Sequence, residues 1–422
     1  MSAFDKIFGY EKEKKELTYI CDMMNTPDKY RSFGVEIPKA VLLCGDPGLG
    51  KTLMANAMIE ASGRKSFSCR KTRADGEFVD SIKQTFDDAI ANAPSIVFLD
   101  DMDKFAQDNT DSNSNKEEFV VIQSCLEDIK DKDVFVIATA NDIDNLPSSL
   151  VRAGRFGKQL HFSVPPLADS RKIIAHYLSG KKVADNVDAE MIANILAGHS
   201  CAVLENVINE AGIYAAFEKS EYITKDHLVK AILRVVLKTV EEEDMDEFTM
   251  KKTAYHEAGH ALIAIHSKMK VGLVTIQRHG SSGGICKSYG DEKSGQTYEK
   301  LKCDIRRKLA GKAAVELQFG VIDMGAESDI ESATYIARDA IETLCVEGFE
   351  YGYDLPRYSE KQARQRVDRI TDKVYSLLQE CYNDCLDIFK RNKSLLDEIA
   401  AKLLEKRTLL YEDLKEYSSI RE

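Results

Sequence analysis

Two histidines and a glutamate in this sequence have the residue types and the spacing of a metal site. Residues 253–261 read TAYHEAGHA, which places His256 and His260 on one face of a helix with Glu257 beside them. Two imidazoles at this spacing can bind one zinc ion, and the glutamate can remove a proton from metal-bound water. Chance matches to this five-residue pattern are common, so the flanking residues have to decide whether it marks a site.

A glycine-rich segment near the N-terminus has the pattern of a phosphate-binding loop. It follows the apolar run 40–44 and precedes apolar residues at helical spacing, which is the strand-loop-helix context that a P-loop requires. The glycines let backbone amides approach phosphate oxygens, Lys51 adds positive charge near the β and γ phosphates, and Thr52 can hold magnesium. The alternative is a chance glycine-rich turn. The predicted nucleotide-binding loop reads GDPGLGKT and consists of Gly45, Asp46, Pro47, Gly48, Leu49, Gly50, Lys51 and Thr52.

Two adjacent aspartates follow the apolar run 96–99. At the carboxyl end of a strand, Asp100 can bind magnesium through water and Asp101 can polarise the water that attacks ATP. Adjacent acids after a strand also occur in ordinary solvated turns. The P-loop upstream favours the catalytic interpretation, so the sequence predicts ATP and Mg²⁺ as ligands of this part of the chain.

The alternation of apolar runs predicts how the chain is divided. Strand-like runs at 40–44, 95–99 and 134–138 are separated by helical spacing, which is typical of a parallel α/β sheet. After Pro165 and Pro166 the pattern becomes helical and predicts a small lid domain. Its expected helices are 171–178, 188–197, 204–219 and 225–237. Between the strands, residues 108–116 are polar loop formers and predict a surface loop.

The second half of the chain reads as a separate domain. The acidic stretch 241–246 predicts a solvated linker, and from Phe248 onward most segments have helical spacing, apart from a β-like stretch at 271–277. The predicted domains are therefore an α/β nucleotide-binding domain at 1–165, a helical lid domain at 166–245 and a mainly α-helical domain at 246–422.

Composition excludes some classes of protein. At 422 residues the chain exceeds one ordinary core, and its net charge of −12 weighs against a nucleic-acid partner. Its ten cysteines include no C-x-x-C pair, which indicates a reducing cytosol, and Cys381 with Cys385 is better explained by two buried small residues than by a metal site. The sequence has no run of about 18 apolar residues and no signal peptide, so a soluble cytoplasmic chain is expected.

The motifs of the first half resemble those of AAA+ ATPases and lie in that family's order. The resemblance implies that Asn141, at the end of IATAN, is the sensor that positions the attacking water. It also implies that Arg152 and Arg155, in LVRAGRF, are arginine fingers that reach a neighbouring subunit's nucleotide. Ordinary surface salt bridges are the alternative for both. A finger supplied in trans implies a ring, and the family resemblance implies a hexamer.

From Thr253 to about residue 418 the chain resembles the peptidase domain of the FtsH family of membrane-anchored, ATP-dependent zinc proteases. The matching stretches include TAYHEAGHA, IRRKLAGKAAVELQFG and GAESDIESATYIARDAI. The resemblance implies Asp329 as the third Zn²⁺ ligand beside His256 and His260, and Glu257 as general base. It also implies that residues 271–277 form an edge strand that holds extended protein substrates. His266 and His279 match no ligand position and are read as structural or surface residues.

Several positions depart from the family pattern. Asp101 replaces the usual glutamate and is one methylene shorter, so hydrolysis is expected to be slow. The pore-loop region, residues 72–83, is short, and Phe78 is either the pore aromatic or a core residue. Residues 126–130 lack the family's Asp-Gly-Phe signal between subunits, and His176 and Tyr177 leave the adenine contact unassigned. The membrane helices are absent, so the chain is either a soluble member or a shortened form of an anchored one.

Three hypotheses follow from these residues. The first is a hexameric ATP-dependent zinc endopeptidase that unfolds protein substrates and feeds them to the zinc site. The second is a zinc peptidase whose weakened ATPase mainly assembles the ring. The third is a non-proteolytic remodelling ATPase with a structural metal, against which the intact set of ligands and general base argues. Manganese or iron remains open as the metal at a site of two histidines and one aspartate.

Overall fold

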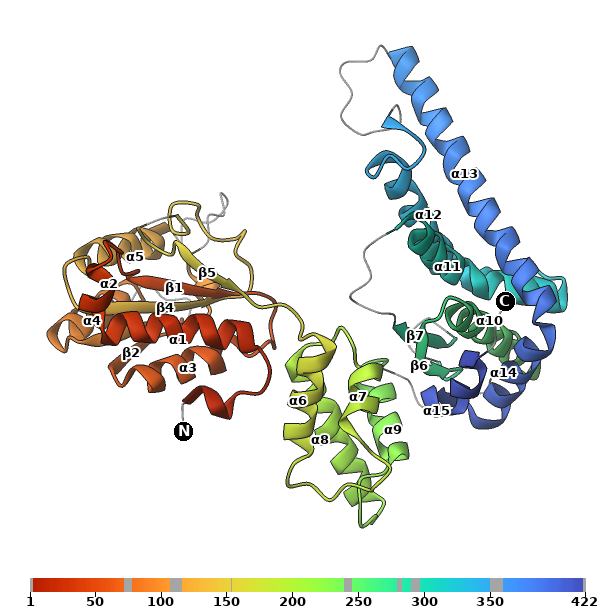
Figure 1. Cartoon of the computed structure of the whole chain (residues 1–422), viewed down its shortest axis with the longest axis horizontal. Coiled ribbons are helices and arrows are strands. Elements are labelled where there is room, and N and C mark those ends of the chain that lie inside the picture. The colour runs from red at the N-terminus through yellow and green to blue at the C-terminus, as the bar shows by residue number, and fades with distance from the viewer. Residues whose placement is uncertain are drawn as a thin grey trace. The chain divides into compact units, whose positions relative to one another are not determined.

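The computed structural model describes residues 3–71, 78–106, 116–152, 154–238, 245–278, 283–289, 297–349 and 360–419. The chain forms two compact units, Met1–Leu228 and Val229–Glu422, which are drawn in Figure 1 and described here separately. Some predicted features lie outside the described residues. These are His279, nearly all of the expected loop at 108–116, most of the expected linker at 241–246 and residues 72–77 of the pore-loop region.

The first unit is built on a five-stranded sheet whose strands all run parallel. Its strand order is β2-β3-β4-β1-β5, formed by Ala40–Cys44 (β1), Lys65–Cys69 (β2), Ser95–Leu99 (β3), Val134–Ala140 (β4) and Lys158–His161 (β5). Every residue of β1, β3 and β4 is buried, which explains their unbroken apolar runs. Because parallel strands end at the same edge, the residues that follow β1, β3 and β4 are brought together there.

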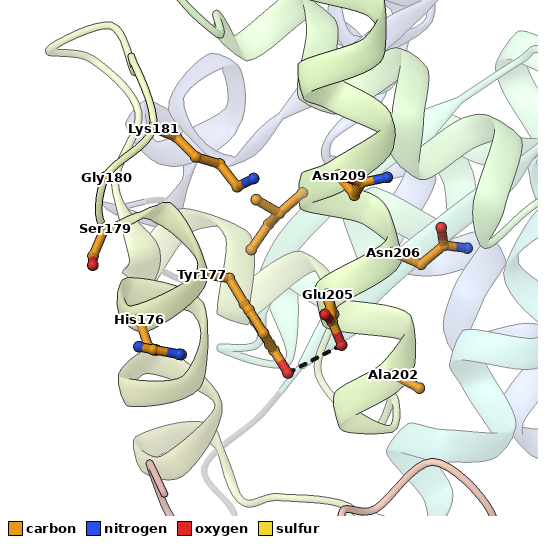
Figure 2. A pocket seen from close by; sticks show the side chains of 10 residues that line it. His176, Tyr177, Ser179, Gly180, Lys181, Ala202, Glu205, Asn206 and Asn209 are labelled. Carbon is orange, nitrogen blue, oxygen red and sulfur yellow. Dashed lines mark hydrogen bonds between the residues drawn. The ribbon is translucent and has the colours of Figure 1, made fainter. Parts of the chain in front are cut away.

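A lid of helices completes this unit. It contains Leu167–Leu178 (α6), Ala189–Ile195 (α7), Cys201–Phe217 (α8) and the start of Lys225–Val235 (α9). Asp188 caps α7 by accepting a hydrogen bond from the backbone of Met191 at 2.7 Å. The N-terminus of α8 lies on the P-loop, where the Ala202 amide donates to the Gly48 carbonyl at 3.0 Å. Helices α6 and α8 line a common pocket (Figure 2).

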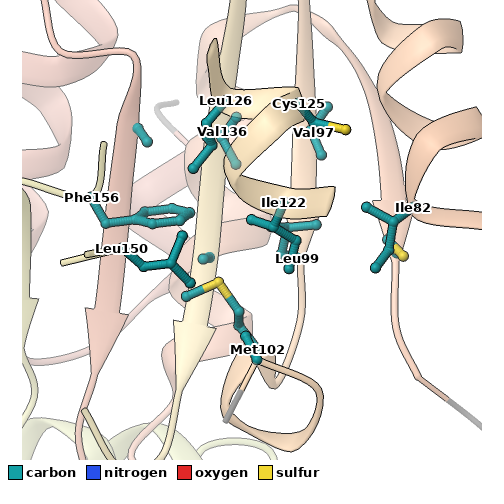
Figure 3. Packing of buried hydrophobic residues seen from close by; sticks show 14 of the residues in the cluster. Ile82, Val97, Leu99, Met102, Ile122, Cys125, Leu126, Val136, Leu150 and Phe156 are labelled. Carbon is teal, nitrogen blue, oxygen red and sulfur yellow. The ribbon is translucent and has the colours of Figure 1, made fainter. Parts of the chain in front are cut away.

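The core of the sheet lies under two helices. Phe78–Ala91 (α4) and Lys116–Asp128 (α5) contribute Ile82, Ile122 and Leu126, which pack against Val97 and Leu99 of β3 (Figure 3). Each fully buried side chain of this kind contributes about 1.5–3 kcal/mol to folding. The other N-terminal helices are Ala3–Lys6, Glu11–Asn25 (α1), Pro27–Arg31 (α2), Lys51–Ser62 (α3) and Met102–Lys104.

The second unit is mainly helical. Its long helices are Glu247–His266 (α10), Tyr298–Phe319 (α11), Glu327–Glu342 (α12), Glu360–Arg391 (α13) and Lys393–Lys406 (α14). The shorter ones are Met324–Ala326, Tyr411–Leu414 (α15) and Lys415–Ser419. Helices α10 and α11 approach closely at Gly259, where a Cβ atom would lie 2.7 Å from both the Ala310 carbonyl oxygen and the Ala314 Cβ. The alanines and glycine at this contact therefore fix how the metal-site helix packs.

The small sheet of this unit shows that the predicted edge strand is a middle strand. Residues 271–277 were expected to form an edge strand, but Lys270–Thr275 (β6) lies in the middle of the order β7-β6-β8 and is antiparallel to both neighbours. The partners are Ile285–Tyr289 (β7) and Thr408–Leu410 (β8). Neither has the apolar alternation that would mark a strand in the sequence, and β8 comes from far along the chain. Among the described strands, β7 is therefore the outer one on this side.

Two further predictions concern the burial of Cys381 and Cys385 and the presence of a membrane-spanning helix. Cys381 and Cys385 are fully buried in α13 and contact backbone carbonyls of α11, as expected of small core residues. Within the described part of the chain, no helix has both the length and the apolar character needed to cross a membrane.

Candidate metal centre and nucleotide site

The structure brings His256, His260 and Asp329 together. The two histidines share one face of α10, and Asp329 is the third residue of α12. The Asp329 Oδ2 atom lies 3.1 Å from His260 Nε2 and 3.5 Å from His256 Nε2, and one ligand atom from each residue falls within 4.8 Å of the others. Two helices that are distant in sequence thus present one oxygen and two nitrogens to the same point.

This donor set fits zinc. Two imidazoles and one carboxylate are the protein ligands of a catalytic zinc site, which keeps one position open. Glu257 is 4% exposed, and its Oε2 atom has no hydrogen-bond partner among the described residues. A buried carboxylate oxygen without a partner is costly in a structural role, and it is the arrangement expected of a group that receives a proton from an attacking water.

A second layer of contacts surrounds the three ligands. The His256 Nδ1 atom lies 2.7 Å from Asp323 Oδ2, and His260 Nδ1 lies 2.7 Å from the Arg307 carbonyl oxygen. The Lys308 ammonium group donates to Asp329 Oδ1 at 3.2 Å, so the other oxygen of that carboxylate faces the histidines. Asp323, Arg307 and Lys308 were not predicted as site residues.

The ionisable groups of this centre hold one another in their charged forms. Burial alone lowers the pKa of His256, but its hydrogen bonds to Asp323 and Asp329 outweigh burial and raise the pKa to about 10. Burial would raise the pKa values of Asp323 and Asp329, whereas their bonds to the histidines hold both well below the usual range. Without a metal, a proton on His256 therefore supplies the positive charge that two carboxylates require. Burial raises the pKa of Glu257 above its ordinary value.

Two glycines make room for these side chains. A Cβ atom on Gly311 of α11 would lie 2.4 Å from atoms of the His256 ring, which is closer than real Cβ contacts come. A Cβ on Gly284 would lie 2.8 Å from Glu257 Cγ and Oε1 and 2.6 Å from the Thr275 carbonyl oxygen. Gly284 directly precedes β7, so this strand begins beside Glu257.

In the first unit, the predicted phosphate loop and its partners also meet. The Lys51 ammonium group donates to the carbonyls of Gly45 and Asp46 at 2.6 and 2.8 Å and to Asn141 Oδ1 at 2.9 Å. Thr52 donates to Asp100 Oδ1 at 3.0 Å. The arrangement brings the P-loop, the acid after β3 and the amide after β4 to one edge of the sheet.

Asp101 is held differently from Asp100. Its backbone is left-handed, with φ 55°, and its Oδ2 atom pairs with Lys104 at 2.7 Å and with Arg70 at 3.2 Å. Burial would raise the pKa of Asp101, but the positive charges of Lys104 and Arg70 lower it. Its other oxygen lies 3.5 Å from the Asn141 amide nitrogen. Two cations thus bind the carboxylate that was predicted to polarise water.

The remaining predicted residues of this unit are Arg152, Arg155 and Phe78. Arg152 is exposed. Arg155 is largely buried; it donates to the Ser149 carbonyl at 2.9 Å and lies 3.4 Å from a carboxylate oxygen of Glu127. Phe78 is buried at the start of α4 and its ring meets that of Phe105 edge-on, with centroids 5.0 Å apart. This is the position of a core residue, and a role in gripping substrate stays a prediction.

The pocket between α6 and α8 has a volume of about 570 Å³. Figure 2 shows Tyr177 directed toward Glu205, to which its hydroxyl donates at 3.3 Å. Ala202, which lines the pocket, is also the residue whose amide binds the P-loop at Gly48. The pocket is therefore adjacent to the phosphate loop. His176 lines it as well and stacks on Phe8, with ring centroids 4.1 Å apart.

Comparison with known proteins gives matches to both halves. The profile of the "ATPase family associated with various cellular activities (AAA)" matches residues 41–164, and that of "Peptidase family M41" matches residues 243–417. These matches and the observed sheet and helices confirm the predicted fold class, a P-loop α/β ATPase module followed by a mainly helical metallopeptidase domain.

Whole-chain relatives carry the name ATP-dependent zinc metalloprotease FtsH. Those from Streptobacillus moniliformis and Mesoplasma florum are each 31% identical, and the one from Chloroflexus aggregans is 32% identical. Each alignment covers 98% of this chain and 63%, 67% and 68% of the respective relative. The chain thus spans about two thirds of the length of these relatives.

Proposed function

This chain belongs to the FtsH family of ATP-dependent zinc metalloproteases, and we propose that it is an ATP-dependent zinc endopeptidase acting on protein substrates. The observation that carries the proposal is the buried Glu257 carboxylate, whose Oε2 atom has no hydrogen-bond partner within the described parts of the chain and which stands beside three converging ligand groups. A structural metal site has no use for such a group.

In the peptidase half, His256, His260 and Asp329 would hold Zn²⁺. The bound ion supplies a Lewis acid that polarises the peptide carbonyl and makes water more acidic. Glu257 takes a proton from the attacking water and delivers it to the leaving amine. Its raised pKa suits this exchange, because a group that accepts and returns a proton works best with a pKa nearer neutrality than that of an exposed glutamate.

An extended peptide would lie along β7. Gly284, the residue before this strand, lies against the Glu257 side chain, so the strand begins beside the proposed general base. Among the described residues, β7 is also an outer strand of its sheet. An added strand would hydrogen-bond through its backbone, which recognises an extended chain more than a particular sequence. Sequence-tolerant cleavage of unfolded segments follows from this arrangement.

In the ATPase half, the P-loop amides and Lys51 would bind the phosphates, and Thr52 with Asp100 would bind Mg²⁺. Lys51 would exchange its bonds to loop carbonyls for bonds to phosphate oxygens. Asp101 and Asn141 would orient the attacking water. The pocket beside Ala202 is the candidate place for the adenine base.

The ring remains part of the proposal. Exposed Arg152 is the better placed of the two arginines to reach a neighbouring subunit's nucleotide, whereas Arg155 would first have to leave Ser149. A finger acting in trans requires an oligomer, and a hexamer is the proposed state. Neither the peptidase with a weakened ATPase nor the non-proteolytic ATPase is favoured by a finding above.

Casein degradation with and without ATP tests the proposal, using the wild type, Glu257→Gln and Lys51→Ala. The matched controls are Glu331→Gln and Lys83→Ala, which change exposed residues of α12 and α4. Loss of cleavage in both site variants, together with a requirement for ATP, is expected of the coupled enzyme. Loss in Glu257→Gln alone would mean that the peptidase works without its motor. Cleavage that survives Glu257→Gln would overturn the proposed protease.

A further inference from the structure

Asp323 lies behind the metal-site histidine and no sequence motif points to it. It is the residue before the short helix Met324–Ala326, between α11 and α12, and it is 4% exposed. Its Oδ2 atom lies 2.7 Å from His256 Nδ1, and its Oδ1 atom lies 3.2 Å from the Lys252 ammonium nitrogen and 3.0 Å from the Gly325 amide nitrogen. All these contacts fix the carboxylate in one orientation.

The contact with His256 decides where that ring carries its proton. A carboxylate accepts a hydrogen bond, so Nδ1 must bear hydrogen, and in the neutral ring the lone pair is then on Nε2. Nε2 is the nitrogen that faces Asp329 and His260. A negative charge behind an imidazole also makes its free nitrogen a stronger metal ligand.

The two histidines differ in this respect. His260 Nδ1 faces the neutral backbone carbonyl of Arg307, whereas His256 Nδ1 faces a charged side chain. A backbone carbonyl cannot be removed by evolution or by mutagenesis without changing the helix, but a side chain can. Asp323 is therefore the part of this second layer whose contribution can be measured.

A purely structural role is the competing explanation. Asp323 accepts a hydrogen bond from the Gly325 amide, which is what an aspartate at a helix N-cap does. That bond and the contact with Lys252 use Oδ1, while the histidine uses Oδ2. Because the two functions use different oxygens, side chains of different length can separate them.

We propose that Asp323 is a positioning residue for the metal: anchored by Lys252 and Gly325, it fixes the tautomer and orientation of His256 so that Nε2 binds zinc. The inference rests on the proposed zinc site. It predicts that zinc affinity depends on Asp323 even when the fold and the helix cap are intact.

The test compares Asp323→Ser, Asp323→Asn and wild type in the full chain. Serine can still cap Gly325 but is too short to reach His256. Asparagine has the right length but a single acceptor oxygen, which can serve His256 only if its amide nitrogen faces the Gly325 and Lys252 donors. Zinc affinity is measured by competition with a chromophoric chelator, and the visible spectrum of the Co²⁺-loaded protein reports ligand geometry. We expect Asp323→Ser to weaken zinc binding about 10- to 100-fold and to alter the Co²⁺ spectrum. Asp323→Asn should recover part of the loss, because its one acceptor oxygen can still bind His256 Nδ1 but cannot also serve Gly325 and Lys252.

Asp397→Ser is the matched control. Asp397 accepts a hydrogen bond from the Tyr255 hydroxyl at 2.8 Å, so it too supports α10 with a carboxylate, but it does not touch a ligand. Its loss should leave zinc affinity and the Co²⁺ spectrum unchanged. Wild-type affinity in Asp323→Ser would overturn the inference, as would an equal loss in Asp397→Ser. If the wild type itself takes up no zinc, it is the proposed function that fails.

Discussion

The metal centre and the nucleotide site differ in how their charged groups are satisfied before any ligand binds. At the metal centre, three ligand groups already converge, and no described residue donates a hydrogen bond to Glu257 Oε2. At the nucleotide site, Lys51 is bonded to two loop carbonyls and Asp101 is paired with Lys104 and Arg70. At the first site the ligand groups can stay in place and one of them gives up a proton, whereas at the second Lys51 and Asp101 have to leave their internal partners.

The cause of this difference lies in the elements that carry the groups. Two of the proposed zinc ligands, His256 and His260, stand on α10, whose close packing on α11 is fixed by small residues such as Gly259 and Gly311. The partners of Asp101 are long side chains that are more than half exposed, 59% for Arg70 and 56% for Lys104. Exposed ion pairs contribute only about 0.2–1 kcal/mol, so the nucleotide site can rearrange at little cost.

Gly311→Ala should have the largest effect, because it disturbs the metal centre and leaves the nucleotide site unchanged. The new Cβ would lie 2.4 Å from the His256 ring, so the ring must move. A displacement of about 1 Å in a catalytic group lowers rates about 100-fold, and we expect at least that loss of casein cleavage, with weaker zinc binding and unchanged ATP binding. Chelator competition, cleavage and nucleotide-binding assays check this.

Gly212→Ala in α8 is the control for that substitution. A Cβ at Gly212 meets only the end of the Ile223 side chain at 3.7 Å, which is an ordinary contact. Because alanine favours helix over glycine by about 1 kcal/mol, neither variant should unfold earlier for reasons of helix propensity. Zinc affinity at the wild-type level in Gly311→Ala would show that the two helices can separate, and that the site is less rigid than its packing indicates.

Zinc binding should depend on pH because a proton occupies the metal-free site. The contacts with Asp323 and Asp329 raise the pKa of His256 from 6.5 to about 10, so at pH 7 zinc must displace that proton. Apparent zinc affinity should therefore rise about tenfold per pH unit between about pH 7 and 9. Calorimetry in two buffers of different ionisation enthalpy should show release of about one proton, and no dependence on the buffer would contradict the assignment.

The raised pKa of His256 should make the metal-free protein less stable at high pH, although zinc affinity increases there. A raised histidine pKa stabilises the folded state fully below pH 6.5 and loses that contribution as pH rises toward about 10. The lowered pKa of Asp329 adds stability above its ordinary value of 3.8 and loses it at more acidic pH. Metal-free protein should thus lose thermal stability from pH 7 to 9 while zinc-loaded protein does not.

The sequence was informative wherever neighbouring residues on one element form the signal. The P-loop, the acids after β3 and the pair His256 and His260 are patterns within a few residues, because a strand, a loop or a single helix turn places them. Asp329 stands on another helix, far along the chain, and only family resemblance pointed to it. The fold class was predictable for the same local reason, since buried parallel strands are unbroken apolar runs.

The parts that were missed depend on packing between distant segments. Arg70 follows β2, and nothing in the sequence relates it to Asp101, whereas Lys104 is only three residues from Asp101. The middle position of β6 depends on β8, which is three residues long. Asp323 is not part of any motif, although aspartate is a preferred residue at a helix N-cap. Its contact with His256 could not be read from that preference.

Removing the cations that bind Asp101 should have a smaller effect, and it tests whether the nucleotide site is held back by its internal ion pairs. Arg70→Ala with Lys104→Ala removes both cations from the carboxylate, which is then free to orient the attacking water. Since each exposed pair contributes about 0.2–1 kcal/mol, loss of one pair should raise ATP turnover by a factor of about 1.4 to 5, and loss of both by a factor of about 2 to 30. Turnover is measured at saturating ATP in the Glu257→Gln background, which prevents self-digestion.

The direction of the change distinguishes two roles for Arg70. Its Nε atom also lies 3.7 Å from Asp100 Oδ2, so it stands beside both acids of the site. If Arg70 moves onto the phosphates when ATP binds, Arg70→Ala will lower turnover and raise the KM for ATP, whereas Lys104→Ala alone will still raise turnover. Lys83→Ala, on the same unit and away from the acids, should change neither. A fall in turnover with both single variants would mean that these cations assist hydrolysis, and that the nucleotide site is as well arranged as the metal centre.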